Sequence, residues 1–170
     1  MTDRPLLNRW IAATDGSCIV GDPDQAGWAW AVSKDPVLFI SNWNAGGMGD
    51  ATSYQAELRA LVELLRFLPE DQPVEVRMDA QNVLRAATRL RHRWRRLGWR
   101  RSQLGDLAHV DLLKEMDTLL EGRDIQFKWV PAHQPKPIAD PLNSFVDRAA
   151  RTAARTQRSP AQKNMVVAQN

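Results

Sequence analysis

The chain has 170 residues, a formal net charge of +3 at pH 7, 44% hydrophobic residues and one cysteine, which suits a single compact domain large enough to bury most of its apolar surface. Cys18 has no second cysteine to pair with and residues 1–10 lack the apolar core of a signal peptide, which argues against a disulfide-bonded secreted protein and predicts a cytoplasmic location. The sequence also lacks a run of roughly 18 to 20 apolar residues, which excludes a membrane-spanning helix.

Strands dominate the first fifty residues, and a helix follows them. Apolar runs bounded by turn residues predict three strands in an antiparallel meander. These strands are Trp10–Thr14, Gly27–Ser33 and Val37–Trp43, with a loop at Cys18–Gln25 and a flexible, glycine-rich break at Gly46–Gly49. Leucines then recur at helical spacing along Thr52–Leu68, and Pro69 ends this helix.

Helices and two further strands make up the rest of the chain. Val74–Asp79 alternates apolar and polar residues as a strand does, which leaves Asp79 on the polar side. Ile125–Val130 is the last strand, and helices are expected at Gln81–Leu90, Asp106–Leu120 and Leu142–Arg155. Residues 156–170 are expected to be a disordered tail.

This order of elements predicts an α/β fold built as one domain over residues 1–155. Strands separated by helices can lie parallel through right-handed crossovers. We therefore expect a five-stranded mixed sheet, in which strands one to three form the antiparallel meander and strands four and five run parallel to strand one, with helices on its flanks. Binding sites in such sheets collect at the carboxyl ends of the parallel strands.

One segment carries most of the positive charge. Eight arginines lie between residues 85 and 101, a stretch without an acidic residue. Removing these eight charges from the net +3 leaves −5 for the rest of the chain. An acidic body with one uncompensated basic limb, here about residues 91–101, can hold a polyanion in a defined orientation. The alternative is a solvated arginine face.

Four acids stand where a carboxylate is costly unless it binds something. Asp15 ends the first predicted strand, Asp79 ends the fourth, Glu57 lies in line with the leucines of the first helix, and Asp147 borders the apolar stripe of the last. Each acid alone is more simply interpreted as a solvated or capping carboxylate. Four of them at matched element ends favour a shared site.

A divalent metal would remove the repulsion within such a group of acids. Oxygen ligands with at most one candidate histidine favour Mg²⁺ or Mn²⁺ over zinc. Two such ions could activate a water and stabilise a leaving oxygen in phosphodiester hydrolysis. The acids therefore predict a hydrolytic metal site.

Short motifs of one known family follow one another in the same order along the chain. They are Thr14-Asp15-Gly16-Ser17-Cys18, Gly27-Trp28-Ala29, Glu57-Leu58, Met78-Asp79-Ala80-Gln81, Trp94-Arg95-Arg96-Leu97-Gly98-Trp99-Arg100, Val110-Asp111-Leu112, Trp129-Val130-Pro131-Ala132-His133 and Asn143-Ser144-Phe145-Val146-Asp147. Each motif is weak alone, but their order over roughly residues 10–155 resembles bacterial-type (type 1) ribonuclease H. The resemblance implies a ribonuclease H-like fold, two Mg²⁺ ions that Mn²⁺ can replace, and endonucleolytic cutting of the RNA strand of RNA/DNA hybrids to 3′-hydroxyl and 5′-phosphate ends.

The resemblance also assigns roles to residues of this chain. It implies that Asp15, Glu57, Asp79 and Asp147 are the metal ligands, with Asp15 bridging both ions, and that His133 assists water delivery or product release. Without the resemblance His133 reads as an ordinary exposed loop histidine. The implied substrate contacts are Ser17, Cys18, Gln81, Asn143, Arg91, Arg93, Trp94, Arg95, Arg96, Trp99 and Arg100, although both tryptophans could instead anchor the limb in the core. We expect a monomer without an obligate protein partner.

Two other functions are compatible with the same fold. A metal-dependent exonuclease of the proofreading type would carry an Asp-x-Glu motif on the first strand. In this chain the third position of that motif is Ser17. A catalytically silent module that binds hybrid or duplex nucleic acid would usually have lost one of the acids, and this chain retains all four. Both alternatives are therefore less favoured than the nuclease.

Overall fold

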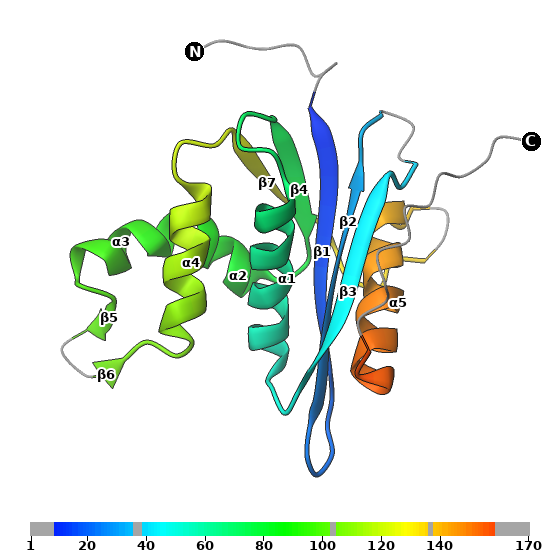
Figure 1. The fold of residues 1–170 in the computed structure, drawn as a ribbon, viewed down its shortest axis with the longest axis horizontal. Helices are drawn as coiled ribbons and strands as arrows, with labels where there is room; N and C mark the ends of the chain where they lie inside the picture. Colours follow the sequence, from blue (N-terminus) through cyan, green and yellow to red (C-terminus); the bar gives the residue numbers. More distant parts are fainter. Residues whose placement is uncertain (1–8, 36–38, 103–104, 136–137, 159–170) are drawn as a thin grey trace, which may run out of the picture.

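A five-stranded sheet forms the centre of the computed structural model, which describes residues 9–35, 39–102, 105–135 and 138–158. Its strand order is β3-β2-β1-β4-β7 (Figure 1). β1, β2 and β3 pair antiparallel, whereas β4 runs parallel to β1 and β7 runs parallel to β4. The strands are β1 (Trp10–Ile19), β2 (Gln25–Ser33), β3 (Asn42–Gly49), β4 (Val74–Met78) and β7 (Ile125–Trp129). The predicted mixed sheet is confirmed.

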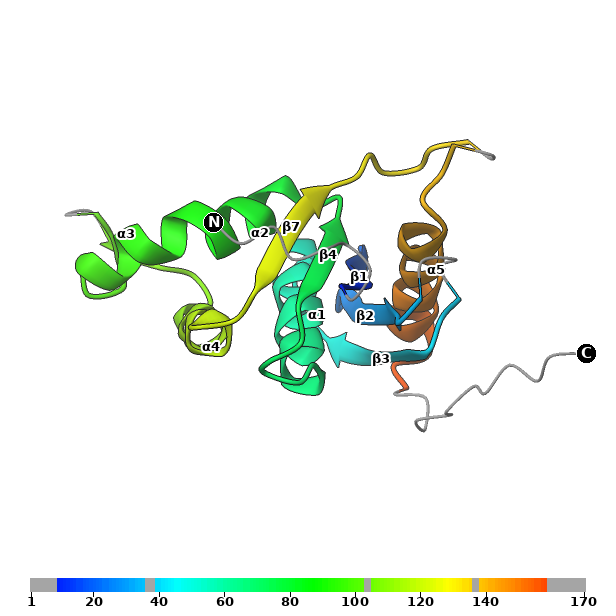
Figure 2. The same ribbon diagram turned by 90° about the horizontal axis from the view of Figure 1, so that it is seen from above.

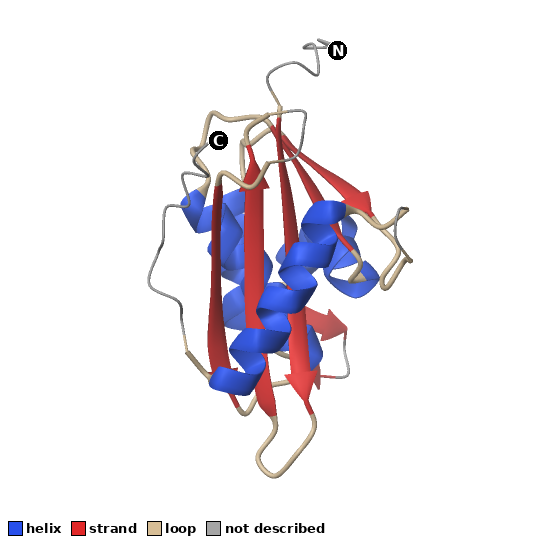
Figure 3. Ribbon diagram, turned by 90° about the vertical axis from the view of Figure 1, so that its right-hand side faces the viewer, coloured by secondary structure: helices blue, strands red, loops and turns tan. Residues whose placement is uncertain are grey.

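Helices cover both faces of this sheet. α1 packs against β1 and β2 on one face, and α5 packs against β1, β2 and β3 on the other (Figures 2 and 3). α4 lies beside α1, while α2, η2 and α3 form a limb that leads away from the sheet to the small β5–β6 hairpin (Figure 1). The bounds are α1 (Ser53–Phe67), α2 (Gln81–Arg85), η2 (Ala86–Leu90), α3 (Arg91–Arg96), β5 (Arg100–Ser102), β6 (Gly105–Asp106), α4 (Val110–Leu120) and α5 (Pro141–Thr156).

Side chains that alternate along the strands build a separate core on each face. Trp28, Trp30 and Val32 of β2 join the leucines of α1 and the apolar face of α4. Ala29 and Ala31 point the other way and meet α5, in a core made largely of alanines. Small side chains allow a helix to approach a sheet closely, and a Cβ on Gly27 would lie only 2.3 Å from the backbone nitrogen of Ala154. α5 is therefore held tightly against β2.

Two predictions about the first strands are wrong. β1 continues to Ile19 rather than giving way to a loop at Cys18, because its second half pairs with β2 as one arm of a hairpin. β3 spans Asn42–Gly49 instead of Val37–Trp43, so the glycine-rich stretch is strand and not a flexible break. Gly46 and Gly47 fill places without room for a side chain, since a Cβ on Gly46 would lie 2.8 Å from the Trp28 ring and one on Gly47 would lie 2.6 Å from the Cα of Gln157. Val37 lies outside the described residues.

The helices agree with the sequence patterns except at their ends. α1 begins after Thr52, whose hydroxyl accepts a hydrogen bond from the Gln55 amide, as a helix N-cap does. The predicted helix from Gln81 contains a π-helical turn at Ala86–Leu90 and continues past Leu90 into α3. α4 begins at Val110, because Asp106 pairs in the β5–β6 hairpin.

The end of α5 corrects part of the predicted tail. Thr156 belongs to α5, and the Gln157 side chain donates to the Ala26 carbonyl oxygen and accepts from the Gly49 amide. These contacts join the helix end to β2 and β3. The rest of the predicted tail, residues 159–170, lies outside the described part of the chain. Within the described part, no helix is long and apolar enough to span a membrane.

Candidate active site

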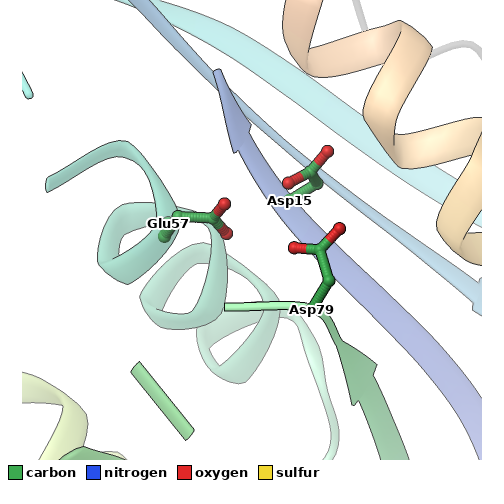
Figure 4. A group of neighbouring side chains, drawn as sticks. All are labelled: Asp15, Glu57 and Asp79. Carbon is green, nitrogen blue, oxygen red and sulfur yellow. The ribbon is translucent and has the colours of Figure 1, made fainter. Parts of the chain in front are cut away.

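Three of the four predicted acids meet at one point beside the sheet. Asp15 of β1, Glu57 of α1 and Asp79, which directly follows β4, each place a carboxylate oxygen within 4.8 Å of the other two (Figure 4). Asp15 is 4% exposed and Glu57 is 9% exposed. Acids from three separate segments therefore share one largely buried site.

The register of the two parallel strands explains why Asp15 meets Asp79. β1 and β4 pair from Trp10 opposite Val74 to Ala13 opposite Arg77. Asp15 and Asp79 each lie two residues beyond that last pair, where the β1–β4 pairing has ended. The sequence had suggested that Asp15 ends the first strand, but Asp15 lies inside β1. The boundary that matters is the end of its pairing with β4.

Gly16 brings Glu57 to the same place. A Cβ at Gly16 would lie 2.3 Å from the backbone nitrogen of Glu57 and 2.6 Å from the carbonyl carbon of Ala56, closer than real Cβ atoms approach. Only glycine permits this contact between α1 and β1. The Gly16 amide also donates a 2.9 Å hydrogen bond to Oδ1 of Asp15. The Asp15-Gly16 pair thus positions two acids at once.

Burial and mutual repulsion disfavour ionisation of the three acids. Burial, followed by the charge of Asp79, raises the pKa of Asp15 to about 7. Burial and the charge of Asp15 raise the pKa of Glu57 well above its ordinary value. Burial also raises the pKa of Asp79, although a hydrogen bond from Asn143 opposes the rise. A bound cation would remove the cost of ionising them together.

Asp147 and His133 lie beside this group rather than within it. A neighbouring hollow of about 200 Å³ is lined by Asp79, His133, Asn143 and Asp147, among others. Asp147 forms a 2.9 Å ion pair with Arg151 one turn later in α5. The His133 Nδ1 atom lies 3.4 Å from the same guanidinium. The structure therefore places the fourth acid next to Asp79 but outside the tight group of three.

Asn143 links the two parts of the site. Its Nδ2 atom donates to Oδ2 of Asp79 across 3.5 Å, and its Oδ1 atom is buried without a hydrogen-bond partner in the described part of the chain. An unpaired buried amide oxygen is costly. The carboxylates of Asp15, Glu57 and Asp79 make an all-oxygen donor set, which fits a hard divalent cation.

A positioning contact that the sequence did not reveal supports the start of α5. Arg77 of β4 is bound by Glu75 at 2.8 Å and by Asp140 at 2.6 Å. Asp140 also caps α5 by accepting from the Asn143 amide at 2.9 Å. The Arg77–Asp140 ion pair thereby joins β4 to the start of α5, two residues before Asp79 and three residues before Asn143. An Asp before Pro141 is a helix-start signal in the sequence, but its partner Arg77 could not be inferred.

Some arginines of the basic limb form ion pairs with an acid of α4, and others do not. Asp117 of α4, 5% exposed, accepts from Arg91 at 2.8 Å and from Arg95 at 2.6 Å. Burial opposes ionisation, but hydrogen bonds from Arg95 and Arg91 lower the pKa of Asp117. The interpretation of Arg91 and Arg95 as uncompensated charges is therefore wrong, because both anchor the limb to α4. Arg93, Arg96 and Arg100 are exposed, and none has an ion pair within the described residues.

The remaining predicted contacts lie at several places around the acids. Trp94 and Trp99 are partly buried and pack against the core around α1, as the anchoring alternative expects. Ser17 and Cys18 continue β1 beyond Asp15, and the Cys18 thiol lies 3.4 Å from the Ala51 carbonyl oxygen. Gln81 is exposed at the start of α2, two residues after Asp79. Their contacts with a substrate stay a prediction.

Comparisons with known proteins agree with this geometry. The RNase H family model matches residues 8–155. The ribonuclease HI of Streptomyces coelicolor is 44% identical over 155 residues, covering 89% of this chain and 64% of that protein, and the ribonuclease H of Tropheryma whipplei strain Twist is 35% identical, covering 86% and 85%. The foamy viral protease-reverse transcriptase, solved in complex with an RNA/DNA hybrid, has the same fold over 22% of its length and 92% of this chain, with a TM-score of 0.76 and 23% identity. Because the family model matches most of the chain and two relatives are 44% and 35% identical to it, this chain belongs to the ribonuclease H family.

Proposed function

We propose that this protein is a metal-dependent endoribonuclease that cuts the RNA strand of RNA/DNA hybrids and leaves 3′-hydroxyl and 5′-phosphate ends. The observation that carries the proposal is the group formed by Asp15, Glu57 and Asp79, with carboxylate oxygens within 4.8 Å of one another, in a member of the ribonuclease H family. The chain spans 64% of the length of its Streptomyces relative. The proposal therefore concerns the activity of this chain, which we take as one domain over residues 1–155 acting as a monomer.

Magnesium suits the donor set, and Mn²⁺ is its natural substitute. Asp15, Glu57 and Asp79 would hold the metal, with Asp147 as a further ligand. Bound there, the ions would lower the pKa of a water and stabilise the leaving oxygen of the phosphodiester. The buried, unpaired amide oxygen of Asn143 gives this interpretation an observation independent of the acids.

Side chains around the acids supply orientation and proton handling. Asn143 hydrogen-bonds to the Asp79 carboxylate, and the Trp129 indole donates to the Asp79 carbonyl oxygen at 3.2 Å, so Asp79 is held from two sides. His133 shares the neighbouring hollow with Asp79 and Asp147. There its imidazole can exchange a proton with water or with the product phosphate. Ser17, Cys18 and Gln81 carry polar groups suited to 2′-hydroxyl contacts, which distinguish RNA from DNA.

A cleavage assay on matched substrates tests the function. With Mg²⁺ or Mn²⁺, the full chain should cut the RNA strand of an end-labelled RNA/DNA hybrid internally and leave double-stranded RNA and double-stranded DNA intact. Binding of hybrid without cleavage under every metal condition would instead identify a silent binding module. Cleavage that proceeds only from the ends of the strand would identify an exonuclease.

The limb prediction separates contact arginines from anchoring ones. Replacing Arg93 and Arg96 with alanine should raise KM for the hybrid and leave kcat and the free energy of unfolding nearly unchanged. The slope of log binding constant against log salt should fall by about 1 to 2, because fewer counterions are released from phosphates. Titrations of labelled hybrid at several KCl concentrations give this slope.

Arg91→Ala is the matched control for this experiment. It removes one positive charge from the same helix, against two in the double variant, and it leaves the buried Asp117 with one guanidinium fewer. It should lower the free energy of unfolding by about 1 to 3 kcal/mol and change the salt slope little. An unchanged salt slope in the Arg93→Ala/Arg96→Ala variant would show that the limb does not touch the substrate.

A further inference from the structure

A second row of arginines lies on α5, far from the limb in the fold. Arg148, Arg151 and Arg155 recur at intervals of three and four residues, which places them on one side of a helix. All three are exposed. We call these three residues the α5 arginine row. It lies across the sheet from α1 and the limb, since α5 covers the opposite face (Figures 1 and 2).

The α5 arginine row borders both the acids and the predicted RNA contacts. It begins at the residue after Asp147, and all three arginines line one surface hollow of about 580 Å³. Ser17 and Cys18 of β1 line the same hollow. None of the described residues that line it is acidic. A basic hollow thus leads away from the acids on the side opposite the limb.

Local structural roles do not account for this row. Arg151 pairs with Asp147, yet its side chain is 50% exposed. Arg148 and Arg155 form no ion pair within the described part of the chain. Arg155 lies in the last turn, where its positive charge interacts favourably with the helix dipole. Arg148 lies near the middle of α5, where this interaction is weak. Arg148 and Arg155 therefore have no charged partner among the residues that the structure describes.

We propose that the α5 arginine row is a second phosphate-binding surface, which holds one strand of the nucleic-acid substrate while the limb holds it on the other side of the acids. This inference rests on the proposed function for the identity of the substrate. At about 1.5 Å per residue, Arg148 to Arg155 spans about 10 Å of helix. A strand lying along the row presents successive phosphates to it, each with one negative charge. The row and the strand thus match in charge.

Binding of hybrid by an Arg148→Ala/Arg155→Ala variant of the full chain tests the inference. Arg151 is left in place because it contacts Asp147 and His133. A labelled RNA/DNA hybrid is titrated without divalent metal, so that nothing is cleaved, at several KCl concentrations. The variant should lose about 1 to 2 from the salt slope and bind roughly 10-fold more weakly at 0.1 M salt. With Mg²⁺, its KM should rise and its kcat should stay within about twofold of the unaltered protein, since the change affects binding of the ground state and of the transition state alike.

Two controls make the outcome specific. Arg59→Ala/Arg66→Ala on α1 removes the same two charges from positions paired with Glu63, and should leave the slope unchanged. Arg148→Lys/Arg155→Lys should restore most of the slope, because phosphate attraction needs charge more than the arginine fork. An Arg148→Ala/Arg155→Ala variant with the slope of the unaltered protein overturns the inference. Failure of the proposed function would differ, because the unaltered protein would then bind hybrid without cutting it while the slope loss remained.

Discussion

Asp15→Asn should abolish hybrid cleavage and, without metal, make the protein more stable. Asn keeps the size of the side chain and an oxygen that can accept from the Gly16 amide, but it removes the charge at the centre of the three acids. Loss of groups that merely support metal ligands costs about 10- to 100-fold in metal affinity or activity. Loss of a carboxylate that itself holds the metal should therefore lower kcat by at least about 100-fold.

The gain in stability follows from the raised pKa of Asp15. Its carboxyl has a pKa of about 7 in the folded protein against an ordinary value of 3.8. Between these values the folded state binds more protons than the unfolded state, so the free energy of unfolding falls as the pH rises from about 4 to about 7. Above pH 7 this cost is complete, on the order of 4 kcal/mol. The Asn variant lacks it.

Thermal or denaturant unfolding in EDTA between pH 4 and 8 measures this effect beside the cleavage assay. The stability gain of Asp15→Asn should be small near pH 4 and largest above pH 7. Mg²⁺ should stabilise the unaltered protein more than the variant, because it binds the folded, ionised site. Asp71→Asn makes the same chemical change at an exposed turn residue and should alter neither property. Cleavage by the Asp15→Asn variant at the rate of the unaltered protein would refute the role of Asp15.

Gly16→Ala should damage both the fold and the site, although it adds only one methyl group. The added Cβ would overlap backbone atoms of Ala56 and Glu57 at 2.3 to 2.8 Å. These atoms belong to a helix packed on a central strand and cannot rotate away as the end of a flexible side chain can. α1 must shift from β1, at a cost of about 1 to 3 kcal/mol or more. A shift of about 1 Å at Glu57 should lower kcat by about 100-fold.

Gly122→Ala separates this packing effect from a general intolerance of alanine. Gly122 has a φ of +73°, and an added methyl group would meet no atom of the described residues within 4 Å. The substitution should therefore cost about 1 kcal/mol of backbone strain and leave kcat unchanged. Chemical denaturation and single-turnover cleavage of both variants supply the comparison. Equal stability of Gly16→Ala and the unaltered protein would mean that α1 does not need the close approach.

The local patterns of the sequence predicted the type of most elements. Leucine spacing predicted α1 within one residue at each end, strand alternation predicted β4 as closely, and the predicted last strand matches β7 within one residue. The patterns were misleading where a partner decides the structure. Gly46 and its neighbours look flexible in isolation, yet they form β3 because Trp28 covers one of them and β2 pairs with them.

The residues of the site likewise include some that the sequence identified and some whose role only the fold revealed. Asp15, Glu57 and Asp79 were recognisable because each is an acid at a position where burial needs a reason, and the fold brings them within 4.8 Å. Arg91 and Arg95 were indistinguishable from the exposed arginines beside them, because their partner Asp117 is 22 to 26 residues away on another helix. The sequence gives the net charge of a segment, but it does not show which of these charges are neutralised by residues elsewhere in the chain.

By itself, the sequence determined the order of the elements, the family resemblance and the acids that form the site, because these depend on residue type and local spacing. The tertiary structure decided the rest: that Asp15 lies inside a strand where its pairing with β4 has ended, that Gly16 admits Glu57, and that Asp147 stands aside with Arg151. These features depend on register, close packing and competition among charged partners. Each is set by residues far apart in the chain, and only folding brings them together.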